Sequence, residues 1–102
     1  MVKKSRPRTE RRVAERDLRR VVRARERIAD LERGGAADYP LEVPSAAVID
    51  GRAIAIPCIQ CQGEYALVEH EREDGLRKVS VKCRRCGAPR RFWFRIVEPG
   101  PN

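Results

Sequence analysis

The hydrophobic pattern separates a helical first third of the chain from a second half rich in short strands. From Thr9 to Arg33, apolar residues recur every three or four positions, which is the period of one helix face. Thr9 is a suitable N-cap and Gly34-Gly35 is a stop signal, so we predict an amphipathic helix over residues 9–33, about 36 Å long. Its apolar stripe is narrow and consists of Ala14, Leu18, Val21, Val22, Ile28 and Ala29.

The polar faces of this helix predict ion pairs between neighbouring turns. Oppositely charged side chains three or four positions apart stabilise a helix by roughly a few tenths of a kcal/mol per pair. Because Arg25 and Glu32 interrupt the stripe, a long homodimeric coiled coil is disfavoured. The sequence leaves open whether the stripe docks on the rest of the chain, on a second copy or on a partner protein. The expected pairs are Glu15 with Arg19, Arg23 with Glu26, and Arg27 with Asp30.

The segments on either side of the helix differ from it in composition. Residues 1–8 are basic and contain no apolar cluster, which predicts a disordered tail. Residues 34–46 predict a linker, flexible at its glycine-rich start and extended near its two prolines. Within the linker, we expect Leu41 and Val43 to lie along the edge of the domain that follows.

The second half, residues 47–97, has the alternation of short β-strands. Asp50-Gly51 is a hairpin signal, and Glu73-Asp74-Gly75 is a second turn signal. The predicted fold class is small α+β, with an antiparallel β-domain preceded by one basic amphipathic helix. Strands are expected at 65–71, 77–82 and 91–97, followed by a tail over residues 98–102.

No segment has the length of a membrane span or the character of a leader. The longest apolar run, Ala53 to Ile59, has seven residues and contains a proline, whereas a membrane-spanning helix needs about 20. The basic N-terminus has no apolar stretch behind it, and Glu10, Glu15 and Asp17 are atypical of a transit peptide. We therefore expect a cytoplasmic protein with no membrane partner.

Four cysteines carry the strongest chemical signal. They form two Cys-x2-Cys pairs, Cys58/Cys61 and Cys83/Cys86, with 21 residues between the pairs. Each pair curls the backbone so that two thiolates reach one ion, and two pairs complete the tetrahedral four-sulfur site that zinc prefers. The alternatives are two disulfides, in one of three connectivities, or a redox pair. A cytosolic chain disfavours disulfides, and a thioredoxin-like pair needs a βαβ context that this sequence lacks.

This arrangement resembles the zinc-ribbon family, in which a β-hairpin joins two cysteine knuckles and a strand follows the second. Residues 56–63 and 81–87 match the knuckles, and the resemblance covers residues 52–97. It implies one zinc ion, which a β-region of about 50 residues also needs for stability. Zinc ribbons bind DNA, RNA, RNA polymerase or other proteins, and many are structural inserts. Rubredoxins share the ligand layout but bind iron and are typically acidic, which disfavours iron here.

Charge adds nucleic acid to the candidate partners. The 102-residue chain has 23 basic and 15 acidic residues, a net charge of +8. Residues 1–33 carry +7, residues 34–57 carry −2 and residues 58–102 carry +3. Nineteen of the basic residues are arginines, which bind phosphate in a bidentate way and stack on bases. This balance favours a nucleic acid or a ribonucleoprotein as partner.

The basic aromatic run near the C-terminus is the candidate binding face. Strand alternation places Phe92 and Phe94 on a core face, and Trp93 between Arg91 and Arg95 on the other. A tryptophan between arginines can stack a base while the cations neutralise phosphates. The structural alternative is that Trp93 packs under the helix or the linker. The candidate nucleic-acid-binding residues are Lys82, Arg84, Arg85, Arg90, Arg91, Trp93 and Arg95.

No catalytic constellation is present in the sequence. The one histidine, His70, is expected at a solvated strand position, and with the cysteines committed to metal no nucleophile–base pair can be proposed. Glu73-Asp74 is similar to the acidic tip of transcript-cleavage factors, but an Asp-Gly turn accounts for it. We therefore expect a non-catalytic zinc-ribbon protein that binds nucleic acid, a polymerase or a ribosome. The alternative is a protein-interaction adaptor with structural zinc, in which the helix 9–33 binds the partner.

Overall fold

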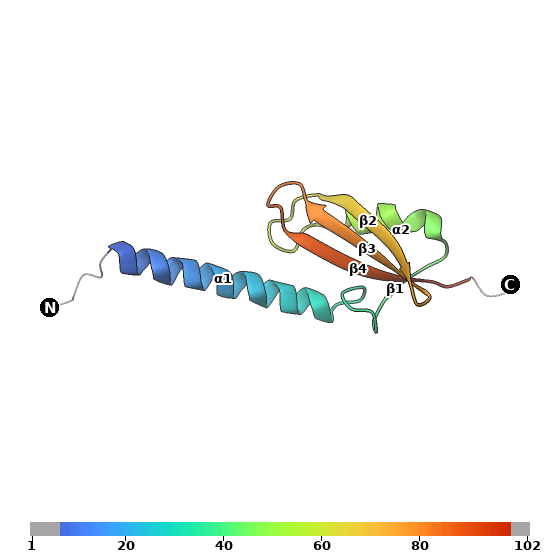
Figure 1. Ribbon diagram of the computed structural model, residues 1–102, viewed down its shortest axis with the longest axis horizontal. Coiled ribbons are helices and arrows are strands. Elements are labelled where there is room, and N and C mark those ends of the chain that lie inside the picture. The colour runs from blue at the N-terminus through green and yellow to red at the C-terminus, as the bar shows by residue number, and fades with distance from the viewer. Residues whose placement is uncertain (1–6, 99–102) are drawn as a thin grey trace.

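The computed structural model describes residues 7–98, so most of the two predicted tails lies outside the described residues. A long helix precedes a four-stranded sheet that has one short helix packed on it (Figure 1). The fold is small α+β, as predicted. Its elements are α1 Pro7–Leu31, β1 Leu41–Val43, the 3-10 turn η1 Ala46–Val48, α2 Ile49–Ala55, β2 Tyr65–Glu73, β3 Leu76–Cys83 and β4 Pro89–Ile96.

Helix α1 begins at Pro7, two residues before the predicted start, because proline is well tolerated in a first helical turn. Most of the helix extends away from the sheet (Figure 1). Its apolar stripe is exposed, with Leu18 66% and Ile28 57% accessible, and among the helix residues whose burial is described only Ala29 is buried. The stripe therefore does not dock on the sheet of the same chain. No helix within residues 7–98 combines the length and apolar character needed to cross a membrane.

The sheet is mixed, with the strand order β1-β4-β3-β2. Strands β2, β3 and β4 are antiparallel neighbours, whereas β1 runs parallel to β4 at the sheet edge. The edge position of Leu41 and Val43 is confirmed. The all-antiparallel sheet is wrong, because β1 enters beside Phe94–Ile96 in the same direction. The β2–β3 turn falls at Asp74-Gly75, whose φ angles of 47° and 79° are those of a two-residue hairpin turn.

The predicted hairpin at Asp50-Gly51 is wrong, because both residues belong to helix α2. Ile49 and Ala53 lie four positions apart, share one side of this helix and are both fully buried. Burial of this apolar pair against the sheet overrides the local turn preference of Asp-Gly. The core that α2 covers includes Val79, Val81, Phe92 and Phe94.

His70 joins the sheet to α2, which corrects the expectation of a solvated position. Its Nδ1 atom lies 2.7 Å from Oδ1 of Asp50, and its side chain is 19% exposed. The pairing register of β2 shifts between Leu67 and Glu69. Without that irregularity, strand alternation from Leu67 would place Glu69 rather than His70 on the α2 side.

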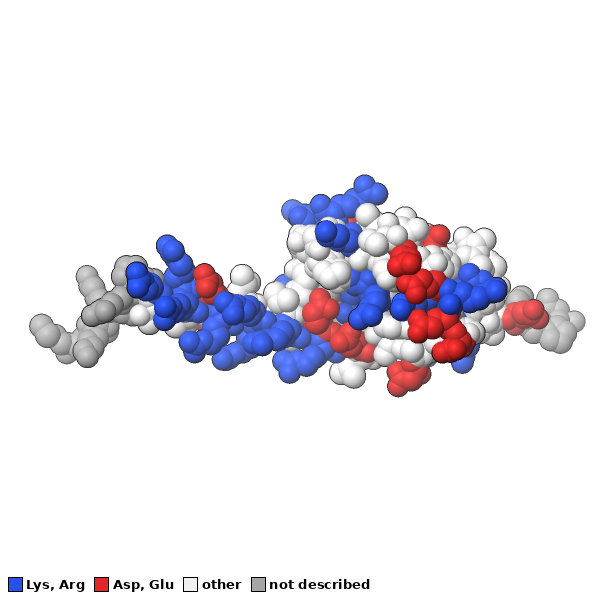
Figure 2. Space-filling model, in the orientation of Figure 1, with Lys and Arg blue, Asp and Glu red and all other residues white. Residues whose placement is uncertain are grey.

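The sheet face opposite α2 is polar and carries one large aromatic side chain. Lys78 and Ser80 of β3 lie on this face beside Trp93 and Arg91 of β4, and Lys82 lies on it opposite Pro89. No described helix lies flat on this face, and the end of α1 approaches only its β4 side (Figure 1). Basic side chains also line the visible side of α1, whereas acidic and basic groups mix over the sheet (Figure 2).

Candidate metal centre and basic groove

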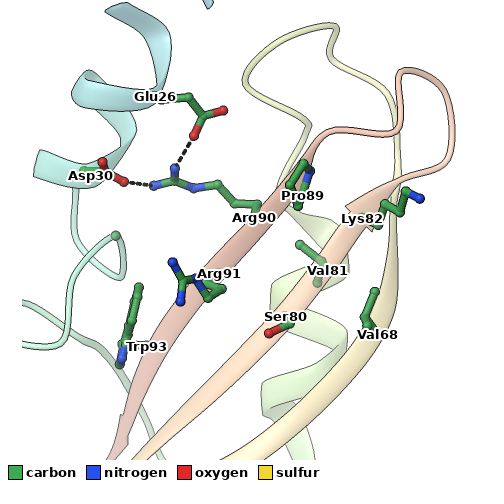
Figure 3. Close-up of a pocket in the computed structure, with 11 residues that line it drawn as sticks. Glu26, Asp30, Val68, Ser80, Val81, Lys82, Pro89, Arg90, Arg91 and Trp93 are labelled. Atoms are coloured by element: carbon green, nitrogen blue, oxygen red, sulfur yellow. Dashed lines mark hydrogen bonds and ion pairs between the residues drawn. The ribbon is translucent and has the colours of Figure 1, made fainter. Parts of the chain in front are cut away.

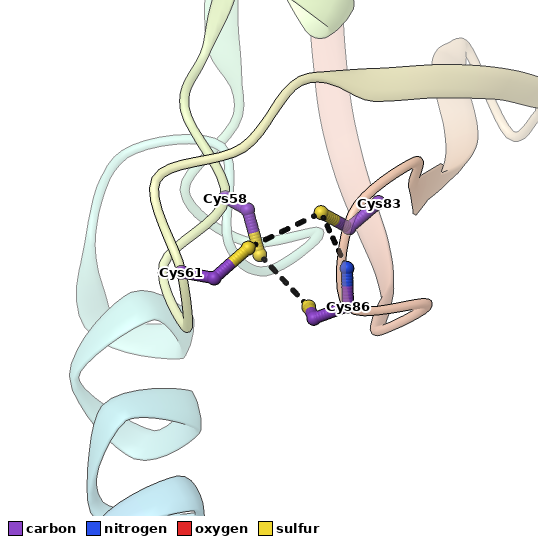
Figure 4. Close-up of side chains that lie close together, drawn as sticks. All are labelled: Cys58, Cys61, Cys83 and Cys86. Carbon is purple, nitrogen blue, oxygen red and sulfur yellow. Dashed lines mark hydrogen bonds between the residues drawn. The ribbon is translucent and has the colours of Figure 1, made fainter.

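The two Cys-x2-Cys pairs meet at one end of the sheet (Figure 4). Cys58 and Cys61 lie in the loop between α2 and β2, while Cys83 ends β3 and Cys86 lies in the loop before β4. The four Sγ atoms lie within 4.8 Å of one another. The structure thus brings together the four cysteines that the spacing identified.

The sulfur spacing suits a single metal ion. The Sγ–Sγ distance is 3.7 Å between Cys58 and Cys86 and 3.4 Å between Cys61 and Cys83. A disulfide requires about 2.05 Å, and all four cysteines are free thiols. A tetrahedral ion with metal–sulfur bonds of about 2.3 Å has sulfur–sulfur edges of roughly 3.8 Å. The four thiols therefore fit a tetrahedral metal ion.

Two loops of the same design present the thiols. In the first loop, the N–H of Gln60 donates a hydrogen bond to Sγ of Cys58 at 3.4 Å. In the second, the N–H of Arg85 donates to Sγ of Cys83 at 3.3 Å. Each loop closes through a 2.9 Å hydrogen bond from the N–H of its first cysteine to the carbonyl five residues later. The first cysteine of each loop therefore receives a backbone N–H donor from within its own loop.

Glycine serves different purposes in the two loops. Gly87 has a φ of 78°, and the corresponding residue of the first loop is Gln62, with a φ of 65°. Gly63 is required for another reason, because neighbouring atoms approach its backbone closely. A Cβ atom there would lie 3.1 Å from Sγ of Cys83 and 2.8 Å from Cβ of Arg85. The backbone at Gly63 therefore forms part of the wall around the sulfurs.

Substitution of Gly63→Ala is expected to weaken metal binding and to lower the stability of the metal-loaded protein by about 1–3 kcal/mol, because the new methyl group must displace Arg85 in the second cysteine loop and crowd the adjacent thiols. Chelator competition and thermal unfolding measure the two effects. Gly51→Ala is the matched control, because a Cβ atom there meets nothing within 4 Å and alanine favours helix α2 by up to about 1 kcal/mol. Parent-like metal affinity and stability in Gly63→Ala would refute the crowding argument.

The surroundings of Cys83 and Cys86 shift the pKa values of their thiols in opposite directions. The N–H groups of Cys86 and Arg85 lower the pKa of Cys83 to about 6, although burial opposes them. For Cys86, the N–H of Ala88 lowers the pKa, but burial and hydrogen bonds with the other three thiols raise it to about 12. Metal binding must therefore release protons, and its affinity falls as the pH falls.

An ion-pair cluster fixes the end of α1 beside the cysteine loops (Figure 3). We call it the Arg90 cluster: Arg90 of β4 lies 2.8 Å from Oε2 of Glu26 and 3.0 Å from Oδ1 of Asp30. The Nε2 atom of Gln60 donates to Oε1 of Glu26 at 2.9 Å, and Arg25 donates to the Gln60 carbonyl at 2.8 Å. Helix α1 is thereby attached both to β4 and to the first cysteine loop.

The Arg90 cluster removes one residue from the candidate nucleic-acid face. The side chain of Arg90 is 7% exposed and bound by two carboxylates, so it is not available to phosphate. Glu26 and Asp30 were predicted to pair within α1 and bind Arg90 instead. A sequence signal existed, because strand alternation places Arg90 on the same face as the buried Phe92 and Phe94.

A groove of about 630 Å³ lies between the end of α1 and the uncovered face of the sheet (Figure 3). Trp93, Arg91 and Lys82 line it, together with the two carboxylates of the Arg90 cluster. Trp93 is half-buried, and the guanidinium of Arg91 lies 5.9 Å from the centroid of its ring. Lys82 and Arg91 are exposed, so the groove has a basic and aromatic wall.

The remaining candidates lie outside this groove. Arg84 and Arg85 are exposed in the second cysteine loop. Arg95 lies toward the other end of β4, where its Nη2 atom is 2.6 Å from Oε1 of Glu42. The groove thus gathers four of the seven sequence candidates, of which Arg90 is bound by carboxylates, and the sequence did not identify α1 as its second wall.

Comparisons of the chain with protein-family models, with curated proteins and with solved structures found no match. The four-cysteine cluster and the basic groove are therefore the observations from which a function is inferred.

Proposed function

We propose that the chain is a non-catalytic zinc-ribbon protein that binds nucleic acid, either alone or within a polymerase or a ribosome. The groove beside the metal centre carries this proposal. Trp93 offers an aromatic face there, Arg91 and Lys82 supply cations, and the two carboxylates of the lining are paired with Arg90. A base can stack on such a face while the cations contact the flanking phosphates.

Zinc is the metal that the four thiols support best. Zinc accepts four thiolates in a tetrahedral shell and has no redox requirement, whereas an iron site of the same layout belongs typically to acidic electron carriers. A shell of four protein sulfurs has no open position for a substrate, so the proposed role of the ion is structural. The ion holds the second cysteine loop next to Lys82 and thereby fixes one end of the groove.

The groove has a size and a charge that suit the binding of a base. Its volume of about 630 Å³ falls within the range of small-ligand sites. Stacking on Trp93 is tolerant of base identity, since every base has a π-face. We therefore expect weak sequence preference and a contribution of about two phosphate contacts, from Lys82 and Arg91, to the salt dependence.

Trp93→Ala tests the groove directly. In fluorescence anisotropy titrations of the full zinc-loaded chain with a labelled 20-nucleotide single strand, this change should cost about 1–3 kcal/mol of binding free energy. Arg91→Gln and Lys82→Gln should each weaken binding to all sequences and reduce the salt slope by about 0.7.

Tyr39→Ala is the matched control for the loss of an aromatic ring. Tyr39 is 45% exposed and stacks with Arg33 outside the groove lining, so its removal should leave binding unchanged. Zinc content and thermal midpoint must be preserved in every variant compared. If Trp93→Ala lowers the thermal midpoint while the Arg91 and Lys82 variants bind like the parent, the strand is structural and the groove is not the binding site.

The exposed stripe of α1 supports a second candidate function, a protein-interaction adaptor. Leu18 and Ile28 are more than half exposed, and α1 extends away from the sheet (Figure 1). Under this alternative, zinc only stabilises the sheet domain and the helix binds a partner through its stripe. A partner that remains bound after nuclease treatment, and is released by Leu18→Asp, would favour the adaptor.

A further inference from the structure

One face of α1 is rich in arginines. At about 100° per residue, seven of them fall within an arc of about 120° and follow one another at three- and four-residue steps along the helix. All seven are exposed, and basic side chains run along the visible side of α1 in Figure 2. We call this the arginine face: Arg8, Arg12, Arg16, Arg19, Arg20, Arg23 and Arg27.

The Arg90 cluster leaves the arginine face with its positive charge. Glu26 and Asp30 fall within the same arc at the sheet end of α1, but both bind Arg90 of β4. Glu15 lies 3.8 Å from Arg19, and both side chains of that pair are more than half exposed. Such an exposed pair is worth little and exchanges readily for a stronger anion.

The chemistry of the arginine face favours a polyanion as its ligand, and its geometry favours a double helix. Guanidinium groups bind phosphate oxygens in a bidentate way. Four-residue steps along an α-helix advance about 6 Å, so the arginines form a rigid row of cations rather than a flexible cluster. Residues 7–31 contain no aromatic side chain on which the bases of a single strand could stack.

We propose that α1 lies along the major groove of double-stranded DNA and contacts the phosphates of both groove walls through the arginine face. This inference rests on the proposed function in taking nucleic acid as the ligand, but it assigns a second site and a different form of nucleic acid. An α-helix is about 10–12 Å across and the B-form major groove is about 12 Å wide. The major groove of A-form RNA is too narrow and deep for a helix with side chains.

The placement of the apolar stripe argues against a membrane surface as the ligand of the arginine face. In a helix that lies on a membrane, the apolar face enters the lipid and basic residues flank it. At the same 100° per residue, the centre of the arginine face lies about 160° around the axis of α1 from the middle of the apolar stripe, which is near Leu18. With Leu18 toward lipid, the arginine face would point away from the anionic headgroups.

The attachments of α1 set the direction in which it would meet DNA. The Arg90 cluster and Gln60 hold only the end of the helix. The preceding turns extend beyond the sheet, where a duplex has access to them (Figure 1). The same helix end also forms a wall of the groove, so the two proposed sites lie next to each other.

The test compares two triple variants that lose the same charge. Arg12, Arg16 and Arg23 are changed to glutamine on the arginine face, and Arg11, Arg52 and Arg72, which are exposed elsewhere, are changed to glutamine as the control. The full zinc-loaded chains are titrated with a labelled 20-base-pair DNA of mixed sequence over a range of salt. Circular dichroism confirms equal helix content.

The arginine-face variant should lose roughly 100-fold in affinity for the DNA duplex at 0.1 M salt, and its salt slope should fall by about 2.7. The control variant should stay within about threefold of the parent. Equal losses in the two variants would show a net-charge effect and overturn the proposal, as would a parent that binds a 20-base-pair RNA or phosphatidylserine vesicles more tightly than the DNA.

Failure of this inference is distinguishable from failure of the proposed function. A parent protein that binds the single strand in a Trp93-dependent way but does not bind the duplex would overturn the assignment of duplex binding to α1. The proposal that the groove binds a single strand would be unaffected. Duplex binding that depends on the arginine face would support the assignment, and single-strand binding that is unchanged by Trp93→Ala in the same experiment would count against the groove.

Discussion

Replacing Cys58 or Cys86 with serine is expected to unfold the whole sheet domain. The core of residues 41–97 is small, and a domain of this size rarely folds without a disulfide or a metal. Zinc binding to four thiolates supplies roughly 10–16 kcal/mol in small zinc modules, and that energy is folding energy. A serine hydroxyl does not replace a thiolate in such a shell, so each variant should lose most of this stabilisation.

Metal analysis, thiol titration and circular dichroism together measure this effect. The parent should contain one zinc and four chelator-releasable thiols per chain, and chelation should reproduce the unfolding seen in the serine variants. Restoring zinc to the chelated parent should refold it, whereas zinc should not rescue either variant. A chelated parent that keeps its thermal midpoint would show that the cysteine cluster is not the source of stability.

The second large loss of stability is expected at the Arg90 cluster. Removing its two carboxylates should cost more than removing its arginine. Glu26→Gln combined with Asp30→Asn leaves the Arg90 guanidinium, which is 7% exposed, without a carboxylate. Leaving one buried charge uncompensated costs about 3–5 kcal/mol. Arg90→Met should cost less, because the carboxylates of Glu26 and Asp30 lie at the helix surface, where water can hydrate them.

Denaturant unfolding of the zinc-loaded variants measures this asymmetry. Combining Arg90→Met with both amide substitutions should recover part of the loss, since no buried charge then remains. Glu15→Gln is the control, because its exposed pair with Arg19 is worth at most about 0.5 kcal/mol. A larger loss from Arg90→Met than from the two amide substitutions would contradict the assignment of the buried charge to Arg90.

The features that the sequence predicted well are those encoded by local signals. The three-to-four period of α1, the Asp74-Gly75 turn and the extended segment at Leu41 each depend on neighbouring residues only. The metal ligands could be identified because the two Cys-x2-Cys pairs have identical spacing, and a single hairpin between them is enough to bring them together. The arginine face was also within reach, since the helical period that reveals the apolar stripe places the arginines opposite it.

The features that the sequence missed depend on distant contacts. Asp50-Gly51 forms a helix because Ile49 and Ala53 pack on strands that follow them by many residues. Arg90 meets Glu26 across 64 residues of chain, a pairing that no local spacing indicates. The positive φ of Gln62 is imposed by the cysteine loop, in which the metal ligands rather than the residue's own preference decide the backbone.

The claim that this chain binds nucleic acid is tested most directly by one salt titration of the unmodified, zinc-loaded protein. Affinities for a labelled 20-nucleotide single strand and for the matching DNA duplex are measured from 0.05 to 0.3 M salt. Saturable binding to both is expected, and the logarithm of affinity should fall linearly with the logarithm of salt concentration, more steeply for the duplex, because counterions are released at each phosphate contact. Absence of saturable binding to either nucleic acid at 0.05 M salt would contradict the proposed function.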